Sequence, residues 1–191
     1  MLQLAEIFYS VQGEGTWTGT PAVFVRLAGC NLSCAFCDTD YALAFVDAID
    51  GVVARVRAAG GACPMVILTG GEPLAQREAL ALIDALRADG RRVHVESNGT
   101  IPTDLPADVW LTVSPKERLN PHLAARANEV KLIVDGRVPA EWLASFPPQT
   151  PVFLQPEGNK PANVALAMEA ALREPTRYRL SLQTHKFIGV R

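Results

Sequence analysis

Three of the four cysteines fall within eight residues, in the segment Cys30-Asn-Leu-Ser-Cys34-Ala-Phe-Cys37. Secreted proteins spread their cysteines so that disulfides join distant segments, whereas clustered thiols in a chain without a secretion signal favour metal binding. Three thiolates can hold three irons of a cubane 4Fe-4S cluster and leave the fourth iron without a protein ligand. A structural zinc would normally receive four ligands. The spacing therefore predicts an iron–sulfur cluster with one position open for chemistry.

The remaining cysteine, Cys63, stands apart from this loop and precedes Pro64 at the entrance of an expected strand. We expect it to be a small buried side chain. It supplies a fourth ligand only if the fold brings it close to the loop. A non-enzymatic zinc module, built from the loop with Cys63 or a histidine, therefore remains an alternative.

Short apolar runs with many β-branched residues predict the buried strands that position this loop. They lie at residues 22–27, 65–68, 93–96, 109–113, 130–134, 152–155 and 178–182, and an extra N-terminal strand is expected at 6–11. Apolar residues at helical spacing predict helices at 46–59, 78–89 and 162–173. Strands that alternate with helices form a mainly parallel α/β sheet. A complete eightfold barrel needs about 250 residues. We therefore expect a partial, incomplete TIM-like barrel of about six parallel β/α units, or an open sheet, in a single domain over residues 1–191.

Polar clusters follow five of these apolar runs at their C-terminal ends. They occupy residues 69–73, 96–100, 114–116, 155–158 and 183–186. Parallel strands present those ends on one face, which is where ligands bind. Turn formation alone explains any single Gly or Pro, but it explains five clusters of charged and amide side chains less well. The pattern therefore predicts an active site at this face.

Two further residues are candidates for chemistry. Arg26 lies inside the apolar run 23–27, where a charge needs a partner, either a ligand or a structural salt bridge. His185 is the only histidine in a strand-end cluster, and its position predicts that it faces the substrate.

The composition narrows the function classes. Eighteen Lys and Arg oppose twenty Asp and Glu, and no stretch concentrates one sign of charge. A broad nucleic-acid footprint is therefore not expected. No window offers the roughly 18 apolar residues of a membrane helix, and the N-terminus has no secretion signal. We expect a cytoplasmic protein that binds neither nucleic acid nor membrane.

The cysteine loop, with Phe36 before its third cysteine and Gly70-Gly71-Glu72-Pro73 after a later strand, resembles the radical S-adenosylmethionine (SAM) superfamily. The resemblance implies that the amine and carboxylate of SAM bind the open iron. An electron from the cluster then breaks the sulfonium bond and releases a 5'-deoxyadenosyl radical. The glycines allow close approach of the backbone, and Glu72 is expected to accept from the SAM ammonium.

Longer segments resemble the 7-carboxy-7-deazaguanine synthase family. They are residues 6–15 (EIFYSVQGEG), 19–26 (GTPAVFVR), 37–39 (CDT), 114–116 (SPK) and 182–186 (LQTHK). The family converts 6-carboxy-5,6,7,8-tetrahydropterin to 7-carboxy-7-deazaguanine with loss of ammonia, on the route to queuosine and other 7-deazapurines. The resemblance thus implies a lyase that contracts a ring by radical chemistry. Hydrogen is taken from C6 and later returned, SAM is regenerated, and Mg²⁺ assists.

The same resemblance assigns roles to individual positions. Cys30, Cys34 and Cys37 hold the cluster, and Thr39 binds Mg²⁺. The positions that contact SAM are Phe36, Cys37, Asp38, Gly71, Glu72, Ser114, Pro115, Lys116, Gln155, Pro156, Glu157 and Gly158. Those that contact the pterin are Val11, Gln12, Gly13, Arg26 and Thr69. The terminal carboxylate of family members can reach the substrate, so Arg191 is added as a substrate-binding residue, although its side chain is basic.

Partners also follow from the resemblance, which implies a homodimer and a reducing partner such as a flavodoxin or ferredoxin. A radical activase, which takes hydrogen from a glycine of another protein, is the rival enzyme. It would share the cysteine loop, but it is not expected to carry both Gln12-Gly-Glu-Gly15 and Gln183-Thr-His185.

Overall fold

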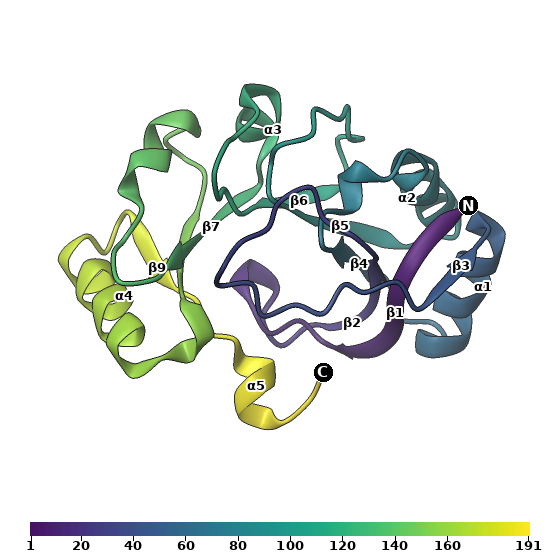
Figure 1. The fold of residues 1–191 in the computed structure, drawn as a ribbon, viewed down its shortest axis with the longest axis horizontal. Helices are drawn as coiled ribbons and strands as arrows, with labels where there is room; N and C mark the ends of the chain where they lie inside the picture. Colours follow the sequence, from purple (N-terminus) through teal and green to yellow (C-terminus); the bar gives the residue numbers. More distant parts are fainter.

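A nine-stranded sheet runs through the chain, and the computed structural model describes all of residues 1–191 (Figure 1). The strands are β1 (Leu2–Val11), β2 (Pro21–Leu27), β3 (Phe45–Asp47), β4 (Met65–Gly70), β5 (Arg92–Ser97), β6 (Trp110–Val113), β7 (Glu129–Val134), β8 (Val152–Pro156) and β9 (Tyr178–Leu180). Their spatial order is β3-β1-β2-β4-β5-β6-β7-β8-β9. β1 pairs antiparallel with β2 and β3. Every neighbouring pair in the series β2-β4-β5-β6-β7-β8-β9 is parallel. The sheet curves but keeps two free edges, which confirms the predicted partial barrel.

Helices cover the convex side of this sheet in Figure 1. They are α1 (Ile49–Gly60), α2 (Ala79–Ala88), α3 (Pro121–Arg126) and α4 (Pro161–Arg173). The short helix α5 (Thr184–Ile188) lies apart from them, near the C-terminus (Figure 1). The helices predicted at 78–89 and 162–173 are confirmed as α2 and α4. None of the helices combines the length and the apolar character that crossing a membrane requires.

The structure differs from the prediction at several elements. The helix expected at 46–59 begins only at Ile49, because residues 45–47 pair with β1 as the edge strand β3. The strand expected at 178–182 ends at Leu180. The short helices α3 and α5 were not predicted, because five or six residues are too few to show a helical period of apolar side chains.

β2 shows how the sheet directs side chains to two different environments. Val23, Val25 and Leu27 belong to the main core of 33 buried residues, between the sheet and the helices. Phe24 belongs to a smaller buried cluster of five residues on the opposite face. Successive side chains of a strand alternate between its faces. Arg26 is therefore the next side chain on the Phe24 face, where a cavity begins.

Candidate active site

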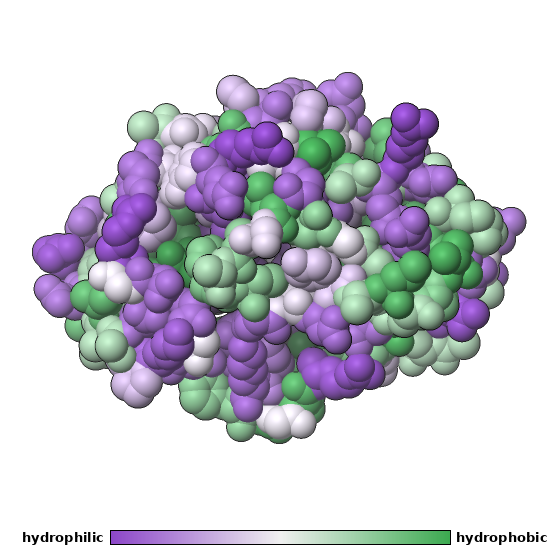
Figure 2. Space-filling view, in the orientation of Figure 1, coloured by the Kyte–Doolittle hydropathy of each residue, from purple (hydrophilic) through white to green (hydrophobic).

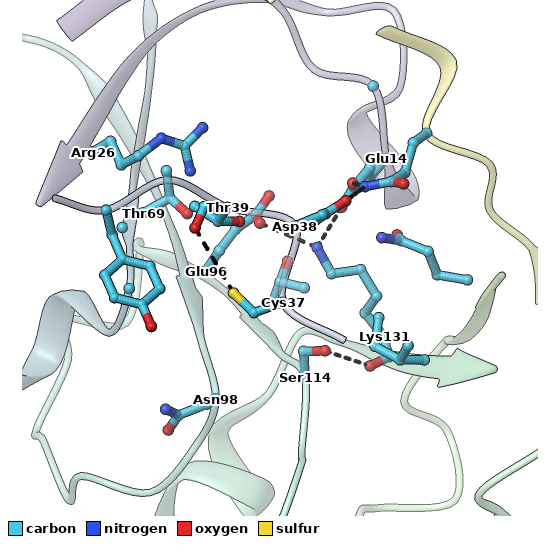
Figure 3. A pocket seen from close by; sticks show the side chains of 18 of the residues that line it. Glu14, Arg26, Cys37, Asp38, Thr39, Thr69, Glu96, Asn98, Ser114 and Lys131 are labelled. Atoms are coloured by element: carbon cyan, nitrogen blue, oxygen red, sulfur yellow. Dashed lines mark hydrogen bonds and ion pairs between the residues drawn. The ribbon is translucent and has the colours of Figure 1, made fainter. Parts of the chain in front are cut away.

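A cavity of about 470 Å³ lies at the C-terminal ends of the parallel strands. All five polar clusters predicted from the sequence contribute side chains to its wall. Figure 2 shows the corresponding face, where polar side chains surround narrow hollows near the centre. Figure 3 shows side chains from the strand ends and from the cysteine loop pointing into the same space. The clusters therefore form one site and are not five separate turns.

The cysteine loop connects β2 to β3 and forms one wall of the cavity. Cys30, Cys34 and Cys37 all line it, and none forms a disulfide. No three Cys, His, Asp or Glu side chains are gathered into a complete metal-ligand set. Burial raises the pKa of the Cys34 thiol, and the Lys116 cation opposes this rise. Three unpaired thiols on one loop facing one cavity fit a 4Fe-4S cluster as a donor set, with room left for a ligand at the fourth iron.

Gly71 brings the end of β4 directly against the cysteine loop. A Cβ added at Gly71 would lie 2.1 Å from the carbonyl oxygen of Gly29 and 2.6 Å from Cβ of Cys30. The amide of Glu72 donates to the same Gly29 carbonyl at 3.1 Å. Only glycine permits this approach, so the glycine pair sets the position of the first cysteine relative to the sheet.

The Glu72 side chain, predicted to accept from the SAM ammonium, does not line the cavity. Its carboxylate is fully buried and accepts from Leu74 N at 3.0 Å, Ser97 Oγ at 2.9 Å and Asn98 N at 2.7 Å. Burial raises the pKa of Glu72, although the Asn98 and Leu74 amides stabilise its anion. The Asn98 side chain in turn donates to Asn31 Oδ1 at 2.9 Å, beside the first cysteine. Glu72 therefore braces the cysteine loop through Asn98.

Arg26 lines the same cavity, together with Thr69 (Figure 3). Its Nε donates to Glu6 Oε1 at 2.8 Å, directly across the β1–β2 pair. The second oxygen of Glu6 pairs with Arg191, whose guanidinium also lies over the Phe8 ring. The terminal nitrogens of Arg26 make no protein hydrogen bond. Arg26 therefore has a structural salt bridge at its Nε, while its terminal nitrogens remain available to a ligand.

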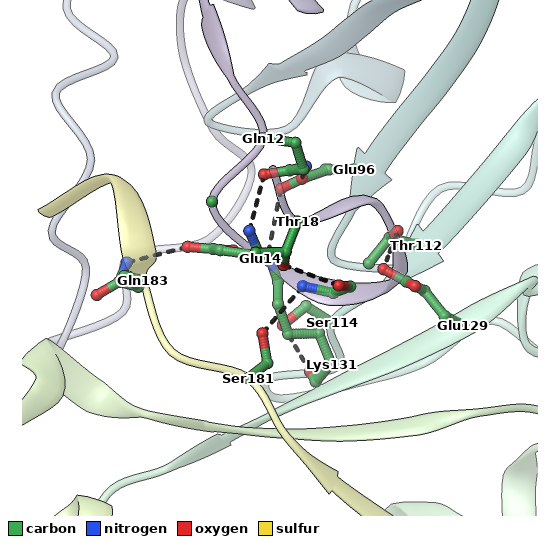
Figure 4. A network of polar contacts seen from close by, with 12 residues as sticks. Gln12, Glu14, Thr18, Glu96, Thr112, Ser114, Glu129, Lys131, Ser181 and Gln183 are labelled. Carbon is green, nitrogen blue, oxygen red and sulfur yellow. Dashed lines mark hydrogen bonds and ion pairs between the residues drawn. The ribbon is translucent and has the colours of Figure 1, made fainter. Parts of the chain in front are cut away.

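A buried ion network, not predicted from the sequence, forms the floor of the cavity (Figure 4). Lys131 Nζ lies 2.5 Å from Glu14 Oε2 and 3.1 Å from Glu96 Oε2, and Gln12 Nε2 donates to Glu96 Oε1 at 2.8 Å. Burial alone would lower the pKa of Lys131, but the two carboxylates outweigh burial and raise it. Burial would raise the pKa of Glu96, yet Lys131 and His94 hold it at about 2. Lys131 and Glu96 are therefore both charged at neutral pH.

Most other predicted residues also line the cavity. They are Val11, Gln12, Gly13, Phe36, Asp38, Thr39, Thr69, Ser114, Lys116, Gln155, Pro156, Glu157, Gly158, His185 and Arg191. Pro115 is buried outside the lining. Burial lowers the pKa of Lys116 to about 8, an effect that Lys131 increases. His185 packs so closely on Gly13 that a Cβ there would lie 2.1 Å from its Nδ1, and burial lowers the pKa of His185.

Cys63 lies apart from this cavity. It is 7% exposed, and its Sγ contacts the carbonyl oxygen of Pro21 at 3.4 Å, at the start of β2. Cys30 follows the other end of that strand. The expectation of a small buried side chain is confirmed, and the zinc module that would use Cys63 as a fourth ligand loses that ligand.

Comparison with known proteins agrees with this site. The sequence model of the radical SAM superfamily matches residues 24–146. The chain is thus a radical SAM protein. It is 43% identical to the 7-carboxy-7-deazaguanine synthase of Bacteroides thetaiotaomicron, over the full length of both chains. It is 40% identical to that of Rhodospirillum rubrum, over 99% of this chain and 92% of the relative. The chain belongs to the 7-carboxy-7-deazaguanine synthase family.

The fold gives the same assignment. The crystal structure of QueE from Escherichia coli superposes with a TM-score of 0.81 and 28% sequence identity, covering 95% of this chain and 93% of the other. The resemblance inferred from the motifs is confirmed, as is the prediction of a radical SAM lyase with a 4Fe-4S cluster and SAM as cofactors.

Proposed function

We propose that this chain contracts the ring of 6-carboxy-5,6,7,8-tetrahydropterin to 7-carboxy-7-deazaguanine with loss of ammonia, using one wall of the cavity for radical generation and the other for the substrate. One observation carries this assignment: the cysteine loop and the available nitrogens of Arg26 line a single cavity. When bound, the cluster and SAM supply the radical that removes hydrogen from the substrate. The residues described below bind and orient the two molecules.

On the substrate wall, Arg26 is assigned to the pterin carboxylate. Glu6 holds its Nε, which turns the two terminal nitrogens towards the cavity as a fork. A fork of two N–H donors matches a carboxylate in a bidentate contact, which a lysine cannot make. Val11, Gln12, Gly13 and Thr69 line the same wall and complete the proposed pterin site.

On the cofactor wall, Phe36, Asp38, Gly71, Ser114 and Lys116 are assigned to SAM, together with the segment Gln155 to Gly158. Gln155 is 5% exposed, and its Oε1 is buried without a hydrogen-bond partner. A buried acceptor left unpaired costs free energy, so such an atom points to a donor on a bound molecule. Lys116 Nζ lies 5.7 Å from the centre of the Phe36 ring, which keeps a cation beside the cysteine loop.

His185 and Thr39 are assigned to proton and metal chemistry. Burial lowers the pKa of His185, so a neutral imidazole faces the substrate side and can hold or release a proton at a ring nitrogen. Thr39 lines the cavity two residues after Cys37, where its hydroxyl can serve as one of the few protein oxygens that Mg²⁺ takes beside water and substrate oxygens.

The proposal extends to the partners. The reaction needs a one-electron donor, for which we propose a flavodoxin or ferredoxin, and we propose a homodimer on the basis of the family. We place the reaction in the cytoplasm, because all four thiols are unpaired and a reducing compartment keeps them so.

The decisive experiment is anaerobic. The reconstituted protein is incubated with dithionite, SAM and 6-carboxytetrahydropterin, and mass spectrometry follows the formation of 7-carboxy-7-deazaguanine. We expect a brown protein that dithionite bleaches and a product 17 Da lighter than the pterin, the mass of the ammonia lost, as follows from the proposed reaction. A colourless zinc protein would refute the assignment. A protein that binds SAM but attacks only a partner's glycine would favour the activase.

A further inference from the structure

The amide of Gln183 lies between the turn after β1 and the cysteine loop. Its Nε2 donates to Glu14 Oε1 at 3.1 Å (Figure 4). The same Nε2 donates to Asp38 Oδ2 at 3.1 Å. Glu14 belongs to the turn after β1 and is paired with Lys131 on the cavity floor. Asp38 directly follows the third cysteine. One side chain thus connects the turn after β1 with the cysteine loop.

The chemistry of these partners fixes the orientation of the amide. An ionised carboxylate only accepts hydrogen bonds, so the NH₂ group of Gln183 must face both acids. The oxygen then points away, and Oε1 is buried without a partner in a side chain that is only 6% exposed. An unpaired buried acceptor is unfavourable. This orientation gives both acids a donor and leaves the oxygen unpaired within the protein, as at Gln155.

Neighbouring contacts seat the same segment firmly. The amide and hydroxyl of Thr184 both donate to the carbonyl oxygen of Gly13, at 3.0 and 2.9 Å. Lys186 pairs with Asp38 at 2.5 Å. Only Gln183 among these residues contacts both Glu14 and Asp38 through one atom, its Nε2. A shift of the turn that carries Glu14 is therefore passed to the cysteine loop.

We propose that Gln183 is a positioning residue that ties the turn after β1, next to the proposed pterin residues Gln12 and Gly13, to the cysteine loop, and thereby fixes the distance between the radical source and the pterin. This inference rests on the proposed function. Transfer between bound groups is sensitive to their spacing, and a misplacement of about 1 Å can cost about 100-fold in rate. A loosened tie should therefore let the radical form without reaching the substrate. The enzyme would then release 5'-deoxyadenosine in place of regenerating SAM.

Three substitutions at Gln183 distinguish the effect of its hydrogen-bond donors from the effect of its size. Gln183→Met keeps the size and removes both donors. Gln183→Lys keeps donors for both acids and has no acceptor. Gln183→Glu places a third negative charge against them. Gln149→Met is the matched control, because Gln149 is exposed and lies outside the cavity.

The first measurement is the amount of 5'-deoxyadenosine released per deazaguanine formed. We expect roughly a tenfold rise in Gln183→Met, a larger rise in Gln183→Glu, a value nearer to wild type in Gln183→Lys, and no change in the control. Melting temperatures and iron content should stay close to wild type. Two results would contradict the inference that hydrogen bonds donated by Gln183 hold the loop. One is a ratio of 5'-deoxyadenosine to deazaguanine in Gln183→Met equal to that of wild type, and the other is a ratio in Gln183→Lys as high as in Gln183→Met.

The second measurement needs neither cofactor nor substrate. Hydrogen exchange of the cluster-free chain should be about fivefold faster at residues 37–41 in Gln183→Met, because a hydrogen bond that restrains the loop is lost. Unchanged exchange there would overturn the inference even if the enzyme is active. Failure of the wild-type protein to form deazaguanine would instead refute the proposed function, and the exchange experiment would still test the tie.

Discussion

Replacing Arg26 separates substrate capture from radical generation. In Arg26→Ala the pterin carboxylate loses a charged, forked donor, and in Arg26→Lys it keeps a charge but loses the fork. Truncating one partner of a desolvated charge pair costs about 2–5 kcal/mol. The Arg26 side chain is 20% exposed, so the lower part of that range applies. We therefore expect about 2–3 kcal/mol, which corresponds to roughly 30- to 150-fold weaker pterin binding.

The structure also sets the cost to folding. Removing Arg26 does not leave Glu6 as a bare anion, because its other oxygen remains paired with Arg191. A partly exposed ion pair contributes about 0–1 kcal/mol. Arg26→Ala should therefore melt within a few degrees of wild type and retain its iron, while it still releases 5'-deoxyadenosine slowly without substrate conversion.

Pterin titration, iron content and thermal melts on the same samples distinguish the two roles of Arg26. Arg55→Ala serves as the control, because Arg55 makes the same Nε contact, with Asp47 at 2.7 Å, but lies outside the cavity. A joint loss of stability and iron would identify a structural brace. Wild-type pterin turnover in Arg26→Ala would rule out both roles.

Three shorter predictions concern the cysteine loop. Alanine at any one of its three cysteines should abolish cluster-dependent activity while Cys63→Ala retains it, and iron and sulfide analysis decides whether Cys63 is dispensable. Activity should fall when Mg²⁺ is removed by a chelator and return when it is added back, with Thr39→Ala responding weakly, whereas unchanged turnover in verified metal-free buffer would contradict the Thr39 assignment. Glu72→Ala leaves three donors without their acceptor and should cost about 3 kcal/mol or more in urea unfolding; a loss below 1 kcal/mol would show that Glu72 is not a brace.

The sequence predicted the strands and the face of the site because those features are local. Arg26 was identifiable as a charge within an apolar run. Lys131 carries the same signal within the run 130–134, but its partner Glu14 lies 117 residues earlier, and only the fold brings the two together. A single charge in a strand therefore indicates that a partner exists, but not which one.

At Glu72 the sequence motif indicates where the backbone lies but not where the side chain points. The motif correctly placed its backbone beside the cysteine loop, since the Glu72 amide bonds to Gly29. The direction of its side chain depends on donors offered by Ser97 and Asn98 at the end of the neighbouring strand. Those donors are available only once β4 and β5 are paired, so local sequence could not decide between a ligand contact and a brace. The same reasoning applies to Gln183, whose two acids come from different loops.

The buried His94 should give the protein a pH-dependent stability that is independent of catalysis. His94 Nε2 lies 2.6 Å from Thr112 Oγ1, and Thr112 donates its proton to Glu129 Oε1 at 2.9 Å. Nε2 must therefore carry the proton that bonds to Thr112, and Nδ1 is buried without a partner. A second proton on Nδ1 would place a buried charge with no acceptor. Burial accordingly lowers the pKa of His94 to about 4.

The sign of the effect follows from proton uptake. Between about pH 6.5 and pH 4, the unfolded chain protonates His94 and the folded chain does not, so the free energy of unfolding falls as the pH falls. From pH 7 to pH 4.5 the loss should be about 2.5 kcal/mol. This window lies above the range in which Glu96, with its pKa of about 2, takes up a proton. Urea unfolding at both pH values should show the loss in wild type and in His122→Gln, whose exposed histidine is the control, but much less of it in His94→Gln. An equal loss in His94→Gln would mean that other groups cause the pH dependence and that His94 is not held neutral by its burial.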